Sequence, residues 1–195
     1  MRMRSSEYSD MNYRPYLEVE WEEFVRFSQS DSRWGDDDYD KYIKKIVGND
    51  TTYHTIGAKG CALTCMAMVL RACGVDTDPG RLNTWLIDNE GFWGTAVIWS
   101  SINNYPNNDK VEYADMLGKG LENGITLPFS SIDPYLRNCH FIVAQVKNPD
   151  TNNQHWIIIK EKENGEYKIV DPSTKNRTTL NDYGNKVYRT IIYKK

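Results

Sequence analysis

The sequence predicts an α+β domain in which helices come first and an antiparallel sheet follows. Two observations lead to this class. Apolar residues recur at helical spacing between residues 61 and 86, and runs rich in Ile, Val and Tyr with strand character fill the chain from residue 139 onward. Helices in one part of a chain and strands in another are typical of α+β domains.

Composition limits the classes of function. The chain has 195 residues, 39% of them hydrophobic, and a formal charge of -3, which suits one soluble globular domain better than a nucleic-acid-binding or disordered protein. The basic N-terminus has no apolar core like that of a signal peptide, and no apolar run is long enough to span a membrane. We therefore expect a polar lead-in over residues 1–20, a single domain over residues 21–195, and a cytoplasmic or virion- or lysis-associated protein without nucleic-acid or membrane partners. The oligomeric state stays open.

The N-terminal part contains one candidate metal loop. The pattern of residues 21–27 predicts a short secondary-structure element that ends by Gln29. An acidic stretch follows this element. Asp36, Asp38 and Asp40 alternate as calcium ligands do, but Lys41 stands where an EF-hand loop needs glycine. A solvated loop is the preferred interpretation, so we expect no metal and no cofactor.

Two helices are predicted next. Residues 61–73 carry apolar side chains at helical spacing and are followed by Gly74, a common residue just after a helix end. The second helix begins at Pro79, with Asp78 as its N-cap, and has Leu82, Trp85 and Leu86 on one side. The Gly-, Asn- and Trp-rich region from residue 91 to 127 gives no clear pattern.

Strands are predicted in the last third of the chain. Four runs have the composition and alternation of strands, and turn residues separate them. They cover residues 139–146, 155–162, 166–171 and 187–193.

Cys61 differs from the other cysteines in its position. Cys61, Cys65 and Cys73 share one predicted helix at spacings that suit burial better than bridging, and no zinc pattern includes Cys139, so all four are expected to be reduced thiols. At the start of that helix, unpaired N–H groups and the helix dipole favour an anionic sulfur. Gly60, without a side chain, would leave room for a substrate carbonyl. The alternative is that Cys61 is an ordinary core cysteine.

A nucleophilic cysteine needs a base, and the sequence has three histidines. His140 adjoins Cys139 on a predicted strand, where neighbours point to opposite faces, so these two cannot act as a pair. We expect His140 to be a core or edge residue and His54 a loop residue. His155 opens one strand, and Asp171 ends the next, as a base and its orienting acid require.

The turn between these strands decides whether His155 and Asp171 share a face. A two-residue turn at Asn164 and Gly165 places them on opposite faces. A three-residue loop that also includes Glu163 pairs Ile159 with Ile169 and puts His155 and Asp171 diagonally on one face. The second register separates apolar from charged residues more cleanly, and we prefer it.

At these residues the sequence resembles a known family. The stretches "QSDSRW" (29–34), "GCALTCMAMVLRACGVDTDPGRLNTWL" (60–86) and "QHWIIIKEKENGEYKIVDP" (154–172) resemble the C39-like peptidases, a branch of the papain-like cysteine peptidases. The resemblance extends from about Phe27 to the C-terminus, with a weak middle, and departs from the family at Cys65, where a small residue is more usual. It implies a papain-like fold in which N-terminal helices with the nucleophile pack on a C-terminal antiparallel sheet with the His and Asp.

The resemblance also implies residue roles. Cys61 corresponds to the nucleophile, His155 to the base, Asp171 to the residue that orients the base, and Gln29 to a donor of the oxyanion hole. The expected activity is cysteine peptidase hydrolysis of a peptide or protein through a thioacyl-enzyme. Trp34 and Trp156 are candidate substrate contacts, with core packing as the alternative.

Two other functions stay open. The same chemistry could act on an amide bond of a bacterial cell-wall peptide, as in lysins of bacteria or phages. A papain-like binding module without turnover is the third hypothesis, and the presence of Cys61, His155 and Asp171 argues against it.

Overall fold

The computed structural model describes residues 24–39, 54–138 and 140–195. The predicted lead-in over residues 1–20 and the predicted positions of Asp40 and Cys139 lie outside them.

The two predicted helices are present nearly at their expected bounds. α1 (Ile56–Lys59) is a short turn before α2 (Cys61–Ala72), and α3 (Pro79–Asp88) follows. Asp78 caps α3 as predicted, because its side chain accepts a hydrogen bond from the backbone N–H of Arg81. α2 is buried from Ala62 to Leu70, which explains why its sequence shows so few polar residues.

A five-stranded antiparallel sheet forms the second half of the fold, in the order β3-β7-β4-β5-β6. Its four C-terminal strands were predicted, whereas β3 was not. β3 is an edge strand with one partner and mostly exposed or half-exposed residues, so it lacks the apolar alternation that marks the others. The strands are β3 (Glu112–Leu117), β4 (Phe141–Lys147), β5 (Gln154–Glu163), β6 (Glu166–Val170) and β7 (Arg189–Lys194).

Short elements fill the region that the sequence left unassigned and the sheet connections. A two-stranded ribbon precedes several 3₁₀ turns, and one short helix leads into β4. These are β1 (Phe92–Trp93), β2 (Ala96–Val97), η3 (Trp99–Asn104), η4 (Leu121–Asn123), η5 (Phe129–Ser131), α4 (Asp133–Arg137) and η6 (Leu180–Tyr183).

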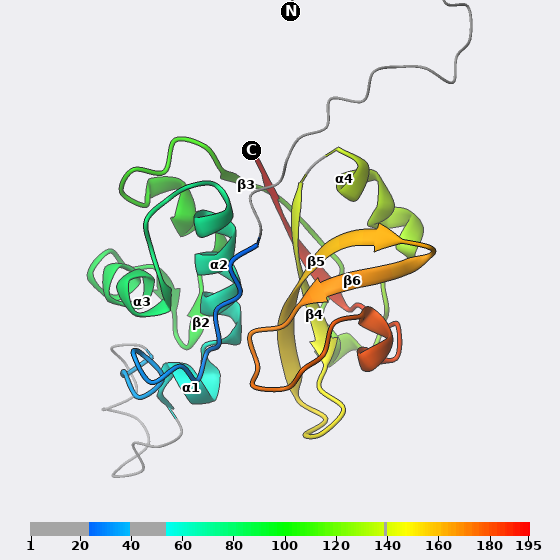
Figure 1. The fold of residues 1–195 in the computed structure, drawn as a ribbon, viewed down its shortest axis with the longest axis horizontal. Helices are drawn as coiled ribbons and strands as arrows, with labels where there is room; N and C mark the ends of the chain where they lie inside the picture. The colour runs from blue at the N-terminus through cyan, green and yellow to red at the C-terminus, as the bar shows by residue number, and fades with distance from the viewer. Residues whose placement is uncertain (1–23, 40–53, 139) are drawn as a thin grey trace, which may run out of the picture.

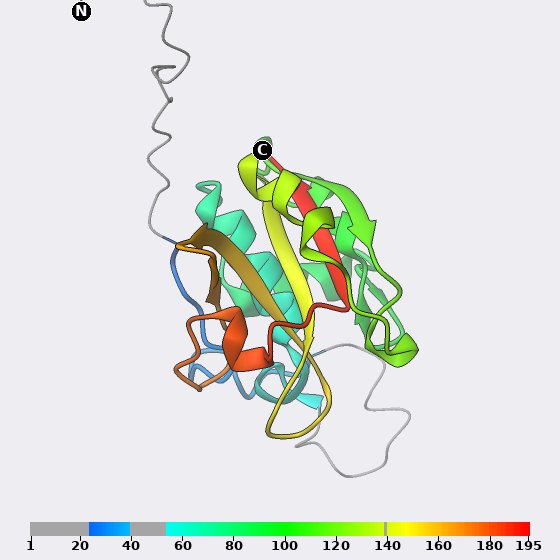
Figure 2. The ribbon, with the colours of Figure 1, turned by 90° about the vertical axis from the view of Figure 1, so that its right-hand side faces the viewer.

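The helices and the sheet make two hydrophobic clusters. α2 lies against one face of the sheet, where it buries residues that include Val143, Trp156 and Ile158. The opposite face is covered by residues around α4 and η6, among them Ile132 and Leu180. Figures 1 and 2 show α2 and α3 on one side of the sheet and α4 with η6 on the other. The predicted order of helices before an antiparallel sheet is confirmed.

The hairpin between β5 and β6 corrects one prediction and confirms another. The turn has two residues, Asn164 and Gly165, both with positive φ (51° and 83°), so the expected three-residue loop is wrong. The register nevertheless shifts between Ile159 and Glu161, and Ile159 pairs with Ile169 as expected. The unpaired extra residue is therefore Lys160, in a β-bulge of β5, and not a third residue of the turn.

The segment before the helices has no regular structure, so the short element expected over residues 21–27 is wrong for the part described, residues 24–27. The segment is held by side chains instead. Phe27 is buried and its ring meets that of Trp34 edge-on, with 5.6 Å between the ring centroids. Residues 24–34 are called here the N-terminal strap, and the Gln29 backbone N–H joins this strap to the loop after β6 through the Pro172 carbonyl, at 2.8 Å.

The helices of the described ranges are too short or too polar to cross a bilayer, since none combines sufficient length with sufficient hydropathy.

Candidate active site

Cys61 is the first residue of α2 and is partly exposed. Gly60 is the N-cap of α2. Packing leaves no room for a side chain at this position, because a Cβ there would lie 2.6 Å from the Ile56 carbonyl oxygen. This close approach lets α1 turn directly into α2. Access for a substrate carbonyl, the role expected from the sequence, stays a prediction.

His155 and Asp171 meet on the sheet. His155 lies at the start of β5, Asp171 follows the end of β6, and both are buried. The His155 Nε2 atom lies 2.8 Å from Asp171 Oδ1. The bulge at Lys160 is the reason why these side chains share a face, since a regular two-residue hairpin would separate them.

Asp171 is held by two further donors. The backbone N–H of Ser173 donates to Oδ1 at 2.8 Å, and the Tyr183 hydroxyl donates to Oδ2 at 2.5 Å. Burial disfavours the charged carboxylate, but the hydrogen bonds from His155, Tyr183 and Ser173 outweigh it and lower the pKa of Asp171. The Tyr183 ring also stacks on the His155 ring, with 5.9 Å between centroids. Tyr183 therefore holds both members of the pair.

His155 also interacts with Cys61, across the seam between helix and sheet. Burial disfavours the charged imidazole, yet the hydrogen bonds to Asp171 and to the Cys61 thiol, in that order, raise the pKa of His155 to about 9. Because Nε2 is bound to Asp171, Nδ1 is the nitrogen available to the thiol. The ring is thus protonated near neutral pH and suited to stabilise a Cys61 thiolate.

This raised pKa predicts a pH-dependent stability. His155 has a pKa of about 9 in the folded protein against 6.5 for an unperturbed ring, so folding is favoured by proton binding. The contribution, roughly 3 kcal/mol, is fully present below about pH 6.5 and is lost as the pH rises through about 9. Urea unfolding at pH 6.5 and 9.5 measures it. The loss should be smaller in His155→Gln, and equal losses in both proteins would contradict the assignment.

The thiols differ in their surroundings. Cys65 and Cys73 are buried, and burial raises the pKa of Cys65 well above its usual range and that of Cys73 to about 11. Cys61 is the most accessible of these three. We expect iodoacetamide near pH 7 to label Cys61 at least about tenfold faster than Cys65 or Cys73. Peptide mapping by mass spectrometry measures the rates, and equal labelling of Cys61 and Cys65 would count against a reactive Cys61.

Gln29 lies beside the same seam. Its Nε2 donates to the Gly57 carbonyl in α1 at 2.7 Å, which occupies one of its two N–H groups. Its backbone N–H donates to the Pro172 carbonyl at 2.8 Å, so Gln29 is tied to the residue that follows Asp171. The side chain is therefore fixed, and its second N–H has no acceptor among the residues that the structure describes.

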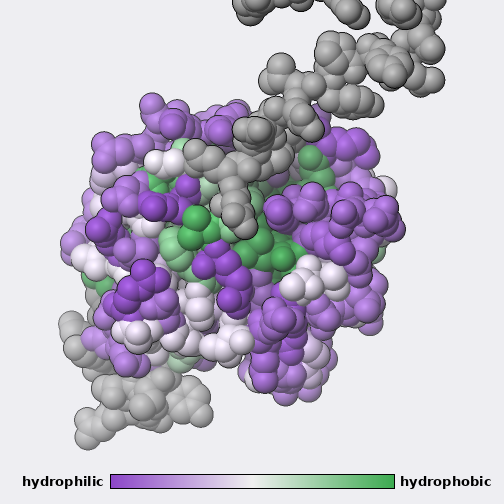
Figure 3. All heavy atoms as spheres, viewed as in Figure 1, coloured by the Kyte–Doolittle hydropathy of each residue, from purple (hydrophilic) through white to green (hydrophobic). Residues whose placement is uncertain are grey.

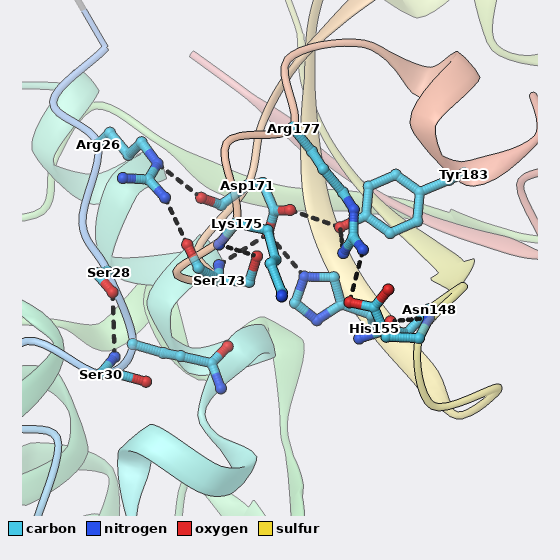
Figure 4. A network of polar contacts seen from close by, with 12 residues as sticks. Arg26, Ser28, Ser30, Asn148, His155, Asp171, Ser173, Lys175, Arg177 and Tyr183 are labelled. Carbon is cyan, nitrogen blue, oxygen red and sulfur yellow. Dashed lines mark hydrogen bonds and ion pairs between the residues drawn. The ribbon is translucent and has the colours of Figure 1, made fainter.

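Arg26 and Tyr183 were not singled out from the sequence. Arg26 Nε donates to the Asp171 carbonyl at 2.9 Å and its Nη2 to the Ser173 carbonyl at 2.5 Å (Figure 4). The figure shows Arg26 reaching from the N-terminal strap to this loop, and Tyr183 on the other side of Asp171. Both contacts are long-range, and no local pattern in the sequence signals them.

The two tryptophans proposed as substrate contacts differ. Trp34 is 2% exposed and its indole N–H donates to the Ser28 carbonyl at 2.9 Å, so the structure places it in the core. Trp156 lines a cavity of about 400 Å³ beside Cys61 and packs against Trp99, with 4.7 Å between centroids. Of these two tryptophans, Trp156 lines the cavity and Trp34 does not, and contact of Trp156 with a substrate stays a prediction.

The other expected positions lie apart from the His155–Asp171 pair. His140 packs edge-on against Tyr135, 5.5 Å between centroids, while His54 lines the cavity beside Cys61. Asp36 and Asp38 lie in the predicted loop. Within the described ranges, no cluster of three or more His, Cys, Asp or Glu side chains is arranged to hold a metal ion.

Comparison with known proteins identifies a family and a similar solved structure. The profile of the Peptidase_C39 like family matches residues 24–194. Among solved structures, the peptidase domain of Streptococcus ComA, a bi-functional ABC transporter involved in a quorum sensing pathway, is similar at 14% identity and a TM-score of 0.42, over 70% of this chain and 91% of that one. No curated protein matches significantly. The expected C39-like resemblance and papain-like α+β fold are confirmed.

Proposed function

This chain belongs to the Peptidase_C39 like family, and on that premise we propose that it is a cysteine peptidase that hydrolyses amide bonds in peptides through a Cys61 thioacyl-enzyme. The observation that carries the proposal is the position of His155, whose ring binds Asp171 at 2.8 Å and whose pKa is raised by Asp171 and by the nearby Cys61 thiol. A buried imidazole between a carboxylate and a partly exposed thiol is the arrangement that nucleophilic catalysis needs.

The first step forms the acyl-enzyme. The Cys61 thiolate attacks the carbonyl carbon of the scissile amide, and the C–N bond breaks as the protonated His155 transfers its proton to the leaving nitrogen. Asp171, held by Tyr183 and Ser173, keeps the proton of the neutral ring on Nε2, so that Nδ1 faces the reaction. In the second step, neutral His155 takes a proton from water, whose oxygen attacks the thioester and releases Cys61.

The negative charge on the carbonyl oxygen needs donors. The backbone N–H of Cys61 lies at the start of α2, where helix N–H groups lack partners within the helix. The free N–H of Gln29 is the second candidate, because its other N–H is fixed to Gly57. In our proposal, these two N–H groups form the oxyanion hole. One such donor lowers the activation free energy by about 3 kcal/mol.

We expect Gln29→Ala to lower kcat about a hundredfold, with a smaller change in KM, because the lost hydrogen bond strengthens in the transition state. Ser28→Ala, one residue earlier on the same strap, is the matched control and should change kcat little. Ser28→Ala should unfold at nearly the wild-type temperature, and Gln29→Ala a few degrees lower, because it loses the hydrogen bond to the Gly57 carbonyl. A kcat that Gln29→Ala leaves unchanged would remove Gln29 from the oxyanion hole.

The substrate class is tested by digestion. The purified protein is incubated with a mixed peptide library and, separately, with purified peptidoglycan, and new termini are identified by mass spectrometry. Cleavage of library peptides supports the peptidase proposal, whereas release of wall peptides alone supports the cell-wall alternative. Absence of cleavage in both, with Cys61 still reactive toward iodoacetamide, would favour a binding module.

A further inference from the structure

The cavity beside Cys61, called here the Cys61 cavity, has an unusual lining. One wall is aromatic and is made by Trp99 and Trp156. Its polar lining includes Lys59, Gln154 and Arg189, and among the described residues that line it none is acidic. A volume of about 400 Å³ gives room for one amino-acid side chain next to the reacting sulfur.

The positions of the oxygen and the nitrogen in the Gln154 amide are fixed by a chain of hydrogen bonds that starts at a backbone N–H of η4. The N–H of Leu121 can only donate, and it donates to Gln145 Oε1 at 2.9 Å. Gln145 Nε2 must therefore donate to its own neighbour, which is Gln154 Oε1 at 2.6 Å. Gln145 is 1% exposed and cannot exchange these partners for water. Gln154 is left with its Nε2 group, whose N–H donors have no protein partner within the described ranges.

The charges of the Cys61 cavity favour a carboxylate over an ammonium group. Arg189 is paired with Glu122 at 2.8 Å, while the exposed Lys59 forms no ion pair with the described residues. A bound carboxylate would meet the Lys59 ammonium and the Gln154 donors. A bound ammonium would meet like charge and would leave those donors unused.

We propose that the Cys61 cavity binds a substrate side chain ending in a carboxamide or carboxylate, such as glutamine or glutamate, and that Gln154 Nε2 donates the hydrogen bond that selects it. The methylene groups of such a side chain pack against Trp99 and Trp156. This proposal rests on the proposed function, because it makes the cavity a specificity pocket for a residue next to the scissile bond.

The test measures occupancy of the cavity without requiring turnover. N-acetyl methylamides of Gln, Glu, Leu and Lys compete with iodoacetamide for access to Cys61, and the concentration that halves the alkylation rate is determined by intact-mass spectrometry. In the wild-type protein, we expect Gln and Glu to protect at about fivefold lower concentrations than Leu, and Lys to protect least. Peptide cleavage is assayed separately, so a protein that binds as expected but does not cleave contradicts only the proposed function.

Two substitutions locate the effect at Gln154. Gln154→Leu removes both donors, and the advantage of Gln over Leu should disappear. Gln154→Glu keeps an acceptor for Gln145 Nε2 and places a carboxylate oxygen in the cavity, so the order should reverse, with Lys protecting better than Glu. Asn153→Leu makes the same change on the neighbouring exposed residue outside the cavity lining and should keep the wild-type order. Wild-type order in both Gln154 variants, or no preference in the wild-type protein, would overturn the proposal.

Discussion

Replacing Cys61 with alanine is expected to lower peptide hydrolysis by about 10⁴-fold or more, to the background rate, because no other described thiol can reach the His155 ring. His155→Ala should be equally inactive, since thiol and imidazole act as one unit. The double variant should be no worse than either single one. The measurement is kcat/KM on the best substrate from the digestion.

Cys73→Ala is the matched control for this prediction. It removes a buried thiol from the cap of the same helix, and wild-type turnover is expected. Thermal unfolding checks that each variant is folded. Hydrolysis that survives in Cys61→Ala would exclude the thioacyl mechanism.

Asp171→Ala is expected to lower kcat about a thousandfold, whereas Asp171→Asn should lower it only about ten- to a hundredfold. The difference follows from the contacts of each oxygen. His155 Nε2 and the Ser173 N–H both use Oδ1, which an asparagine retains as an acceptor. Tyr183 binds Oδ2, and its hydroxyl can turn to accept from the asparagine N–H instead. Alanine leaves all three donors without a partner.

The pH profile of kcat separates orientation from a merely structural role. Without the carboxylate the His155 ring is less readily protonated, so its pKa should fall in both Asp171 variants and the alkaline limb should move to lower pH. Tyr183→Phe, which keeps the carboxylate and the stacked ring, should lose only several-fold in kcat. Equal activity of Asp171→Ala and the wild-type protein, or an unmoved alkaline limb, would argue against Asp171 as the orienting group.

Local sequence patterns predicted the elements that bring the site together. α2 and α3 were predicted from apolar spacing and from the Asp78–Pro79 start signal, and four strands from their composition. Each of these signals lies within one element and depends on burial of one or both faces. β3 carries no such signal, because a half-exposed edge strand owes its place to its partner β7.

The contacts that hold Asp171 could not be predicted in the same way. Arg26 reaches it from 145 residues away in sequence, and Tyr183 from the 3₁₀ turn η6. A single arginine or tyrosine in an irregular segment has no periodicity that would identify its partner. The register between His155 and Asp171 was inferred correctly although the turn was not, because the pattern at Ile159 and Ile169 depends on burial and not on the turn itself.

The bulge at Lys160 has a consequence for how this hairpin can change in evolution. The two-residue turn and the extra residue in β5 shift the register by one position each, and together they keep His155 and Asp171 on one face. If the bulge straightened while Lys160 stayed in the strand, Ile159 would pair with Val170 and His155 would turn away from Asp171 although the sequence motif stayed intact. Deletion of Lys160 would instead keep Ile159 opposite Ile169, so homologous hairpins with this two-residue turn should either carry the bulge or lack this one residue, with no compensating insertion in the turn.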